Sequence, residues 1–139
     1  MGKVFGRTYM EDKKLIQKAA EARKKAYAPY SKFKVGAALL TKKGKVYTGA
    51  NVENSSYGLS MCAERVALFD AVSSGEKEFS RLVIVANTRN PITPCGACRQ
   101  ILLEFCDDLE IISATIKGKA KGFTLKELYP FPFKASLKN

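Results

Sequence analysis

The chain has 139 residues, of which 46% are hydrophobic and 27% charged, and this length and composition predict one globular domain over residues 1–139. No apolar run approaches the roughly 20 residues that a transmembrane helix needs, and the first residues lack the apolar core of a signal peptide, so we expect a cytoplasmic protein without a membrane partner. The net charge of +11 comes from lysines scattered along the chain, which favours a solvated basic surface over a nucleic-acid-binding one.

The first third of the chain predicts a helix followed by a β-hairpin. Apolar residues recur at helical spacing from about Tyr9 to Tyr27, and Pro29 stops the pattern. Residues 33–40 and 46–52 are typical of two antiparallel strands. The small residues at 36–38 predict that another element packs very close to this part of the sheet.

The rest of the chain alternates between helical patterns and buried strands. In chain order we expect a helix over 62–74, a strand over 82–86, a helix with Thr93 as N-cap and Pro94 at its first position, and a strand over 111–116. Gly118 and Gly122 then frame a turn or short strand, and a short helix runs from Thr124 to about Pro130. This order predicts an α/β protein with three layers, α/β/α, around a mixed and roughly five-stranded sheet.

Three cysteines and one glutamate carry the chemistry of the sequence. Cys62 stands at one expected helix start, and Cys95 and Cys98 stand three residues apart at another. The chain has no histidine, so a metal would have to be held by sulfur and protons moved by a carboxylate such as Glu64. Three protein ligands, an open position for water and a nearby acid/base are the elements of a catalytic zinc site.

Two other interpretations of these cysteines remain open. The pair Cys95 and Cys98 is also the spacing of a redox motif, and Cys106 could supply the fourth sulfur of a structural zinc site. Cys106 follows a run of leucine and phenylalanine, however, and is more typical of a core residue. We favour the catalytic site with three sulfur ligands.

We expect Arg65 to offset the excess negative charge of the three thiolates in that site. Three thiolates outweigh the two charges of Zn²⁺, and an electron-rich metal activates water poorly. We hypothesise that Arg65 donates to a ligand sulfur and withdraws charge without touching the substrate.

The segments Cys62-Ala63-Glu64-Arg65 and Pro94-Cys95-Gly96-Ala97-Cys98-Arg99-Gln100 together resemble the zinc-dependent cytidine deaminase family. The resemblance extends to residues 29–38, 51–57 and 125–133, and the short length is similar to that of the homotetrameric branch. It implies one Zn²⁺ per subunit and hydrolytic deamination of cytidine and deoxycytidine to uridine and deoxyuridine plus ammonia, in pyrimidine salvage. In the family a zinc-activated water attacks C4 of the base, and the residue matching Glu64 protonates N3 and then the departing ammonia.

The resemblance also implies a set of substrate-binding residues and a shared active site. These residues are Phe33, Asn51, Glu53, Ser55, Tyr57, Ala63 and Phe133. Asn51 and Glu53 match positions that bind the ribose hydroxyls, while Ser55, Tyr57 and Phe133 match positions that reach neighbouring subunits. The bulk of Tyr129, Phe131 and Pro132 departs from the family pattern. Rival readings are an editing-type polynucleotide deaminase, a deaminase of an aminopyrimidine nucleoside antibiotic, and a zinc module without activity.

Overall fold

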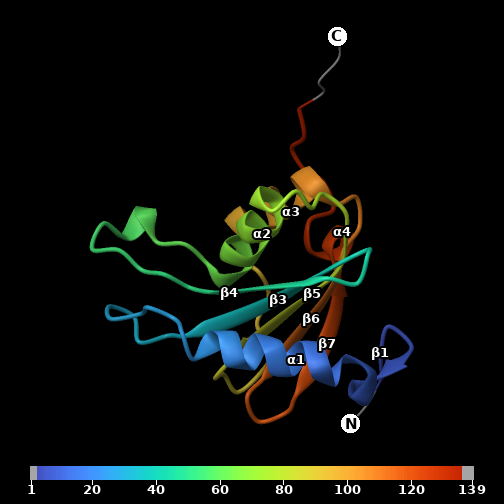
Figure 1. Ribbon diagram of the computed structural model, residues 1–139, viewed down its shortest axis with the longest axis horizontal. Coiled ribbons are helices and arrows are strands. Elements are labelled where there is room, and N and C mark those ends of the chain that lie inside the picture. The colour runs from blue at the N-terminus through green and yellow to red at the C-terminus, as the bar shows by residue number, and fades with distance from the viewer. Residues whose placement is uncertain (1–2, 136–139) are drawn as a thin grey trace.

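The computed structural model describes residues 3–135, and within this range it leaves out the side chains of residues 3–4 and 8–11. Figure 1 shows a layer of strands with helices on both sides. The elements are β1 (Lys3–Val4), β2 (Arg7–Thr8), α1 (Tyr9–Arg23), β3 (Val35–Thr41), β4 (Val46–Ala50), a 3₁₀ turn (Tyr57–Leu59), α2 (Ala63–Ser73), β5 (Phe79–Ala86), α3 (Gly96–Phe105), β6 (Glu110–Thr115), β7 (Ala120–Thr124) and α4 (Leu125–Leu128). No helix in the described residues is both long and apolar enough to cross a bilayer.

The main sheet has five strands in the order β4-β3-β5-β6-β7. Strands β5 and β6 are parallel, and every other neighbouring pair is antiparallel. Helix α1 covers one face, while α2, α3 and α4 lie on the other (Figure 1). Residues 82–86 of β5 are buried on both faces, as their unbroken apolar run predicts. The predicted three-layer architecture with a mixed five-stranded sheet is confirmed.

Two glycines let helices approach the sheet closely. A Cβ on Gly36 of β3 would lie 1.9 Å from the carbonyl oxygen of Ala19, so α1 rests directly on the strand backbone. On the other face, a Cβ on Gly49 of β4 would lie 2.5 Å from the amide nitrogen of Ala67 in α2. Gly36 confirms the close approach predicted from the small residues at 36–38, and Gly49 sets the height of α2, the helix that carries Glu64, above the sheet.

The first long helix ends four residues earlier than its apolar pattern predicts. Helix α1 stops at Arg23, whose Nε donates to the carbonyl oxygen of Lys34 at 3.0 Å. Beyond it, Tyr27 is extended and forms a β-bridge with Val52, and its amide donates to the carbonyl oxygen of Asn51 at 2.9 Å. The prediction of a helix to Tyr27 is therefore wrong, because pairing with Val52 competes with further helical turns.

An N-terminal hairpin, β1–β2, has no counterpart in the predicted elements. Arg7 of β2 pairs with Glu110 of β6 at 2.7 Å, and Arg81 of β5 pairs with Asp12 of α1 at 3.0 Å. The Glu110 hydrogen bond raises the pKa of Arg7 despite its partial burial. These ion pairs join the hairpin and α1 to the sheet on the face opposite the thiols.

Candidate active site

Two helix N-termini meet where the three cysteines lie. Cys62 is the N-cap of α2 and Cys95 is the N-cap of α3, both with extended backbone, and Cys98 is the third residue of α3. The first amides of a helix carry positive partial charge, which stabilises thiolates placed there. Helix α3 therefore begins after Cys95, and the prediction that Thr93 caps it with Pro94 at the first position is wrong by two residues. The hydroxyl of Thr93 instead accepts a hydrogen bond from Arg99.

The three sulfur atoms are spaced as zinc ligands require. Sγ of Cys62 lies 3.7 Å from Sγ of Cys95, which lies 3.4 Å from Sγ of Cys98, and all three atoms lie within 4.8 Å of one another. Tetrahedral zinc with Zn–S bonds of about 2.3 Å places its sulfurs about 3.8 Å apart. The cluster thus fits Zn²⁺, and in the described part of the chain no fourth His, Cys, Asp or Glu joins it.

Cys106 stands apart from this group. It is the C-cap of α3, at the end opposite Cys98, and it is buried in the core between the sheet and helices α2–α4. Burial, with the nearby charge of Asp107, raises the pKa of the Cys106 thiol to about 11. A thiol of this kind is a neutral core group, as the sequence predicts, and it does not close a site with four sulfurs.

Arg65 contacts a thiol of the cluster, as hypothesised. Its Nη2 donates to Sγ of Cys62 at 3.4 Å. The hydrogen bond from Cys98 lowers the pKa of the Cys62 thiol to about 5, with Arg65 contributing further against the effect of burial. The same contact with Cys62 raises the pKa of Cys98, so the pair shares one negative charge. Of the two thiols, Cys62 is the one whose ionised form these contacts favour.

Glu64 is the buried carboxylate beside the cluster. It is the second residue of α2 and only 5% exposed, next to the fully buried Ala63. Burial raises the pKa of the Glu64 carboxyl, and the negative charge of Cys62 adds to the effect. A carboxyl group with a raised pKa holds a proton more readily than an exposed one, which suits it to act as a general acid/base.

Asn51 and Glu53 both hold the segment that carries Phe33. The amide of Asn51 donates to the carbonyl oxygen of Phe33 at 2.8 Å, and its oxygen accepts from the amide of Val35 at 2.8 Å. Glu53 Oε1 accepts from the backbone amides of Tyr30 and Ser31 at 3.0 and 3.1 Å. Each side chain keeps unused hydrogen-bonding capacity, because an amide has two donors and a carboxylate about four acceptor positions.

Glu53 stays ionised in this arrangement. Its Oε2 accepts a hydrogen bond from the hydroxyl of Ser31, and this bond is the main cause that lowers the pKa of the Glu53 carboxyl. Sequence reasoning missed Tyr30 and Ser31 as partners of Glu53, although both lie in a segment that carries the family resemblance. A hydroxyl and two amides next to an exposed carboxylate are hard to recognise when they are 22 residues away in sequence.

A β-bridge joins this segment to the first thiol. The amide and carbonyl of Val52 exchange hydrogen bonds with those of Met61, at 3.0 and 2.8 Å, directly before Cys62. Residues 53–60 therefore form a loop whose two ends are joined by this bridge, and Figure 1 shows the loop projecting from the body of the protein. Asn51 and Glu53 flank the paired Val52, so both lie near the thiol end of α2.

Three of the remaining predicted binding residues, Ser55, Tyr57 and Phe133, are exposed. Ser55 and Tyr57 are exposed on the projecting loop, where the Tyr57 ring meets Tyr30 edge-on at 5.8 Å. Glu53, Tyr57 and Tyr30 line a cleft of about 300 Å³ with Ser31 and Ser60. Phe133 lies on the C-terminal segment, 73% exposed. The structure brings the three thiols together and links the segment of Asn51 and Glu53 to the residue before Cys62 through the bridge of Val52 and Met61, while Ser55, Tyr57 and Phe133 are exposed.

Comparisons with known proteins agree with this geometry. Residues 10–114 match the family model described as the cytidine and deoxycytidylate deaminase zinc-binding region. A cytidine deaminase from Halalkalibacterium halodurans is 48% identical over 91% of this chain and 96% of its own length. The crystal structure of a cytidine deaminase from Burkholderia pseudomallei superposes with a TM-score of 0.84 at 48% identity, covering 91% of this chain and 99% of that one. A more distant relative, 29% identical over 88% of this chain and 92% of its own, is a blasticidin-S deaminase from Bacillus cereus. The chain therefore belongs to the zinc-dependent cytidine deaminase family.

Proposed function

We propose that the protein hydrolyses cytidine and deoxycytidine to uridine and deoxyuridine with release of ammonia. The observation that carries the proposal is the buried carboxyl of Glu64 beside three sulfur atoms that leave one metal position open. A structural zinc site has no use for a buried carboxyl group with a raised pKa. A reaction that needs both an activated water and a proton carrier would use this carboxyl group as the proton carrier.

Each residue then has a role in the reaction. Cys62, Cys95 and Cys98 hold the zinc, which when bound lowers the pKa of a water to about 7. Glu64 would take up in turn the two protons that the attacking water loses, giving the first to N3 of the base and the second to the departing amine, which leaves as ammonia. Burial of Glu64 keeps bulk water away from the proton, because its carboxyl is almost wholly enclosed.

Substrate binding is assigned to the loop residues. Asn51 and Glu53 use their remaining hydrogen-bonding positions for the ribose hydroxyls, and Phe33, whose backbone Asn51 fixes, packs against the nucleoside. Ala63, fully buried at the start of α2, is assigned to the substrate site by the family resemblance alone. The ionised Glu53 would repel a 5′-phosphate placed nearby, which favours a free nucleoside over a nucleotide or a polynucleotide.

The active form is proposed to be a homotetramer with shared sites. Ser55, Tyr57 and Phe133 are all exposed, and a second subunit would cover them and complete the pocket of its neighbour. Sedimentation equilibrium tests this assembly of four 15.3-kDa chains. A cytoplasmic role in pyrimidine salvage is part of the same proposal, and the single domain over 1–139 remains a prediction.

The direct test is the loss of cytidine absorbance on addition of the zinc-loaded protein. We expect turnover of cytidine and deoxycytidine, and little or none of cytosines in single-stranded DNA or of blasticidin S. Turnover of the DNA would favour the editing-type reading, and preference for blasticidin S would favour the antibiotic reading. A zinc-loaded protein that turns over none of them would be a zinc module.

Replacing Arg65 with Gln tests its role at the thiols. The change removes a positive charge 3.4 Å from Sγ of Cys62, so more electron density reaches the metal and water is activated less well. We expect the rising limb of the pH profile of kcat to move up by about one pH unit, with KM changed less than about twofold. Arg89→Gln, on an exposed arginine between β5 and α3, is the matched control. An identical pH profile for Arg65→Gln and wild type would exclude this role.

A further inference from the structure

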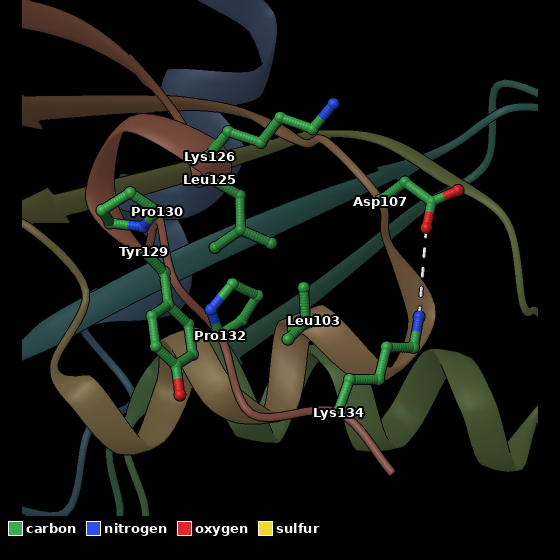
Figure 2. Close-up of a pocket in the computed structure, with 8 residues that line it drawn as sticks. All are labelled: Leu103, Asp107, Leu125, Lys126, Tyr129, Pro130, Pro132 and Lys134. Atoms are coloured by element: carbon green, nitrogen blue, oxygen red, sulfur yellow. Dashed lines mark ion pairs between the residues drawn. The ribbon is translucent and has the colours of Figure 1, made fainter. Parts of the chain in front are cut away.

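The chain after α4 returns along α3 and is held there by two consecutive residues of that helix. Nη1 of Arg99 donates to the carbonyl oxygen of Leu128 at 2.8 Å, and Nε2 of Gln100 donates to the carbonyl oxygen of Phe133 at 2.8 Å. We call residues 128–133 the C-terminal strap. Figure 2 shows Tyr129, Pro130 and Pro132 of the strap around a cleft whose other side is formed by Leu103 of α3.

The hydroxyl of Tyr129 closes a ring of hydrogen bonds at Phe133. It donates to Oε1 of Gln100 and accepts from the amide of Phe133 at 3.4 Å. Because Gln100 also holds the carbonyl oxygen of Phe133, both backbone groups of that residue are fixed by side chains. Its phenyl ring nevertheless remains 73% exposed. The strap therefore orders the backbone of Phe133 and leaves its ring free for another surface.

The same anchor reaches the turn that precedes the metal site. Nε of Arg99 donates to the carbonyl oxygen of Pro94 at 2.8 Å, and Nη2 donates to the hydroxyl of Thr93 at 3.0 Å. A guanidinium is planar with five donors in fixed directions, so one group can hold two chain segments in a set relation. Arg99 thereby fixes the strap to the turn that leads into Cys95.

We propose that Arg99, Gln100 and Tyr129 are positioning residues that present Phe133 to the nucleoside site of a neighbouring subunit in register with the metal centre. The proposal rests on the proposed function, in which Phe133 contacts the substrate of another subunit. An aromatic ring on a backbone that is ordered before assembly loses little entropy when it binds, which strengthens the contact it makes. The bulky Tyr129, a departure from the family pattern, supplies the hydroxyl on which the ring of hydrogen bonds depends.

The test is Tyr129→Phe, which removes one hydroxyl and keeps the ring in the cleft. Loss of its two hydrogen bonds should raise KM for cytidine about 3- to 10-fold, because substrate contact through Phe133 is weakened. The kcat should stay within about twofold and the zinc content unchanged, because Glu64 and the thiols are untouched. Tyr47→Phe, the same change on β4 away from the strap, is the matched control and should leave KM unaltered.

Two further measurements separate positioning from simple stability. If Tyr129 acts through Phe133, the double variant Tyr129→Phe/Phe133→Ala should have the KM of Phe133→Ala alone. Chymotrypsin reports on the strap without any activity, since Pro130 and Pro132 protect the bonds after Tyr129 and Phe131 and leave the bond after Phe133 as the one aromatic site of the strap open to it. Tyr129→Phe should be cut there several times faster than wild type.

The outcomes are distinct. An unchanged KM in Tyr129→Phe, with or without faster cleavage, overturns the positioning role, and so does a KM effect that adds fully to that of Phe133→Ala. An unchanged cleavage rate shows that the strap is not held by these hydrogen bonds and also overturns the proposal. If the wild-type protein does not turn over cytidine, the proposed function fails, and the cleavage rates alone then decide whether these residues hold the strap.

Discussion

Glu64→Gln should reduce turnover of cytidine by about 10³-fold or more while the protein keeps its zinc. Gln has the size and polarity of Glu but cannot accept or release a proton at its amide. General acid/base catalysis contributes about 10²- to 10⁴-fold, and this one carboxyl group is assigned two proton deliveries in the same cycle. The measurement is kcat for cytidine, with zinc determined on the same samples.

The zinc content of Glu64→Gln decides whether a loss of turnover comes from the missing proton carrier or from a missing metal. Glu64 is not among the three residues whose ligand atoms form the cluster, so its replacement should leave about one zinc per chain. Glu104→Gln, the same change at an exposed position of α3, is the matched control and should match wild type in both measurements. If Glu64→Gln lost its metal, the carboxyl would be a ligand or a structural support; if it kept both metal and turnover, another group would carry the proton.

The sequence was sufficient for the parts of the site that depend on local order. Cys95 and Cys98 are three residues apart at the start of one helix, so helix geometry alone places these two thiols on one face, and Cys62 and Glu64 stand at the start of another helix. The meeting of the two helix starts was predicted from chemistry, because three thiols and a carboxylate form a catalytic zinc site only when they lie together. The fold class followed from hydrophobic periodicity, which the buried strands and one-sided helices confirm.

What the sequence did not predict depends on contacts between distant segments. The end of α1 depends on the bridge between Tyr27 and Val52, 25 residues apart. The start of α3 is a local matter, because Cys95 is its N-cap and the hydroxyl of Thr93 accepts from Arg99 instead. The apolar pattern favoured a helix as far as Tyr27, and tertiary hydrogen bonds prevailed there. The partners of Glu53 are of the same kind, because nothing local marks Ser31 as the donor to a carboxylate. Long-range side-chain bonds of this sort are weak individually and leave no periodic trace in the sequence.

Cys98→Ala should abolish stable zinc binding and, with it, turnover. Cys98 is fully buried at the N-terminus of α3 and is one of three sulfurs, so its loss leaves two ligands and removes the hydrogen bond that most lowers the pKa of Cys62. Metal affinity and the stability of the thiolate therefore fall together. We expect the zinc content of the purified protein to fall below about a tenth of an equivalent and kcat to fall by about 10³-fold or more.

Cys106→Ala is the control that shows whether the loss of zinc is specific to the position of Cys98. It is the same substitution at another buried cysteine of the same helix region, eight residues further along, and it removes a neutral core thiol. The small cavity it leaves should destabilise the fold by about 1 kcal/mol, while zinc content and turnover stay at wild-type values. Thermal unfolding of both variants separates loss of metal from loss of fold. If Cys106→Ala lost zinc as Cys98→Ala does, the metal would need a fourth sulfur, no position would remain for water, and the assignment of a hydrolytic site would fail.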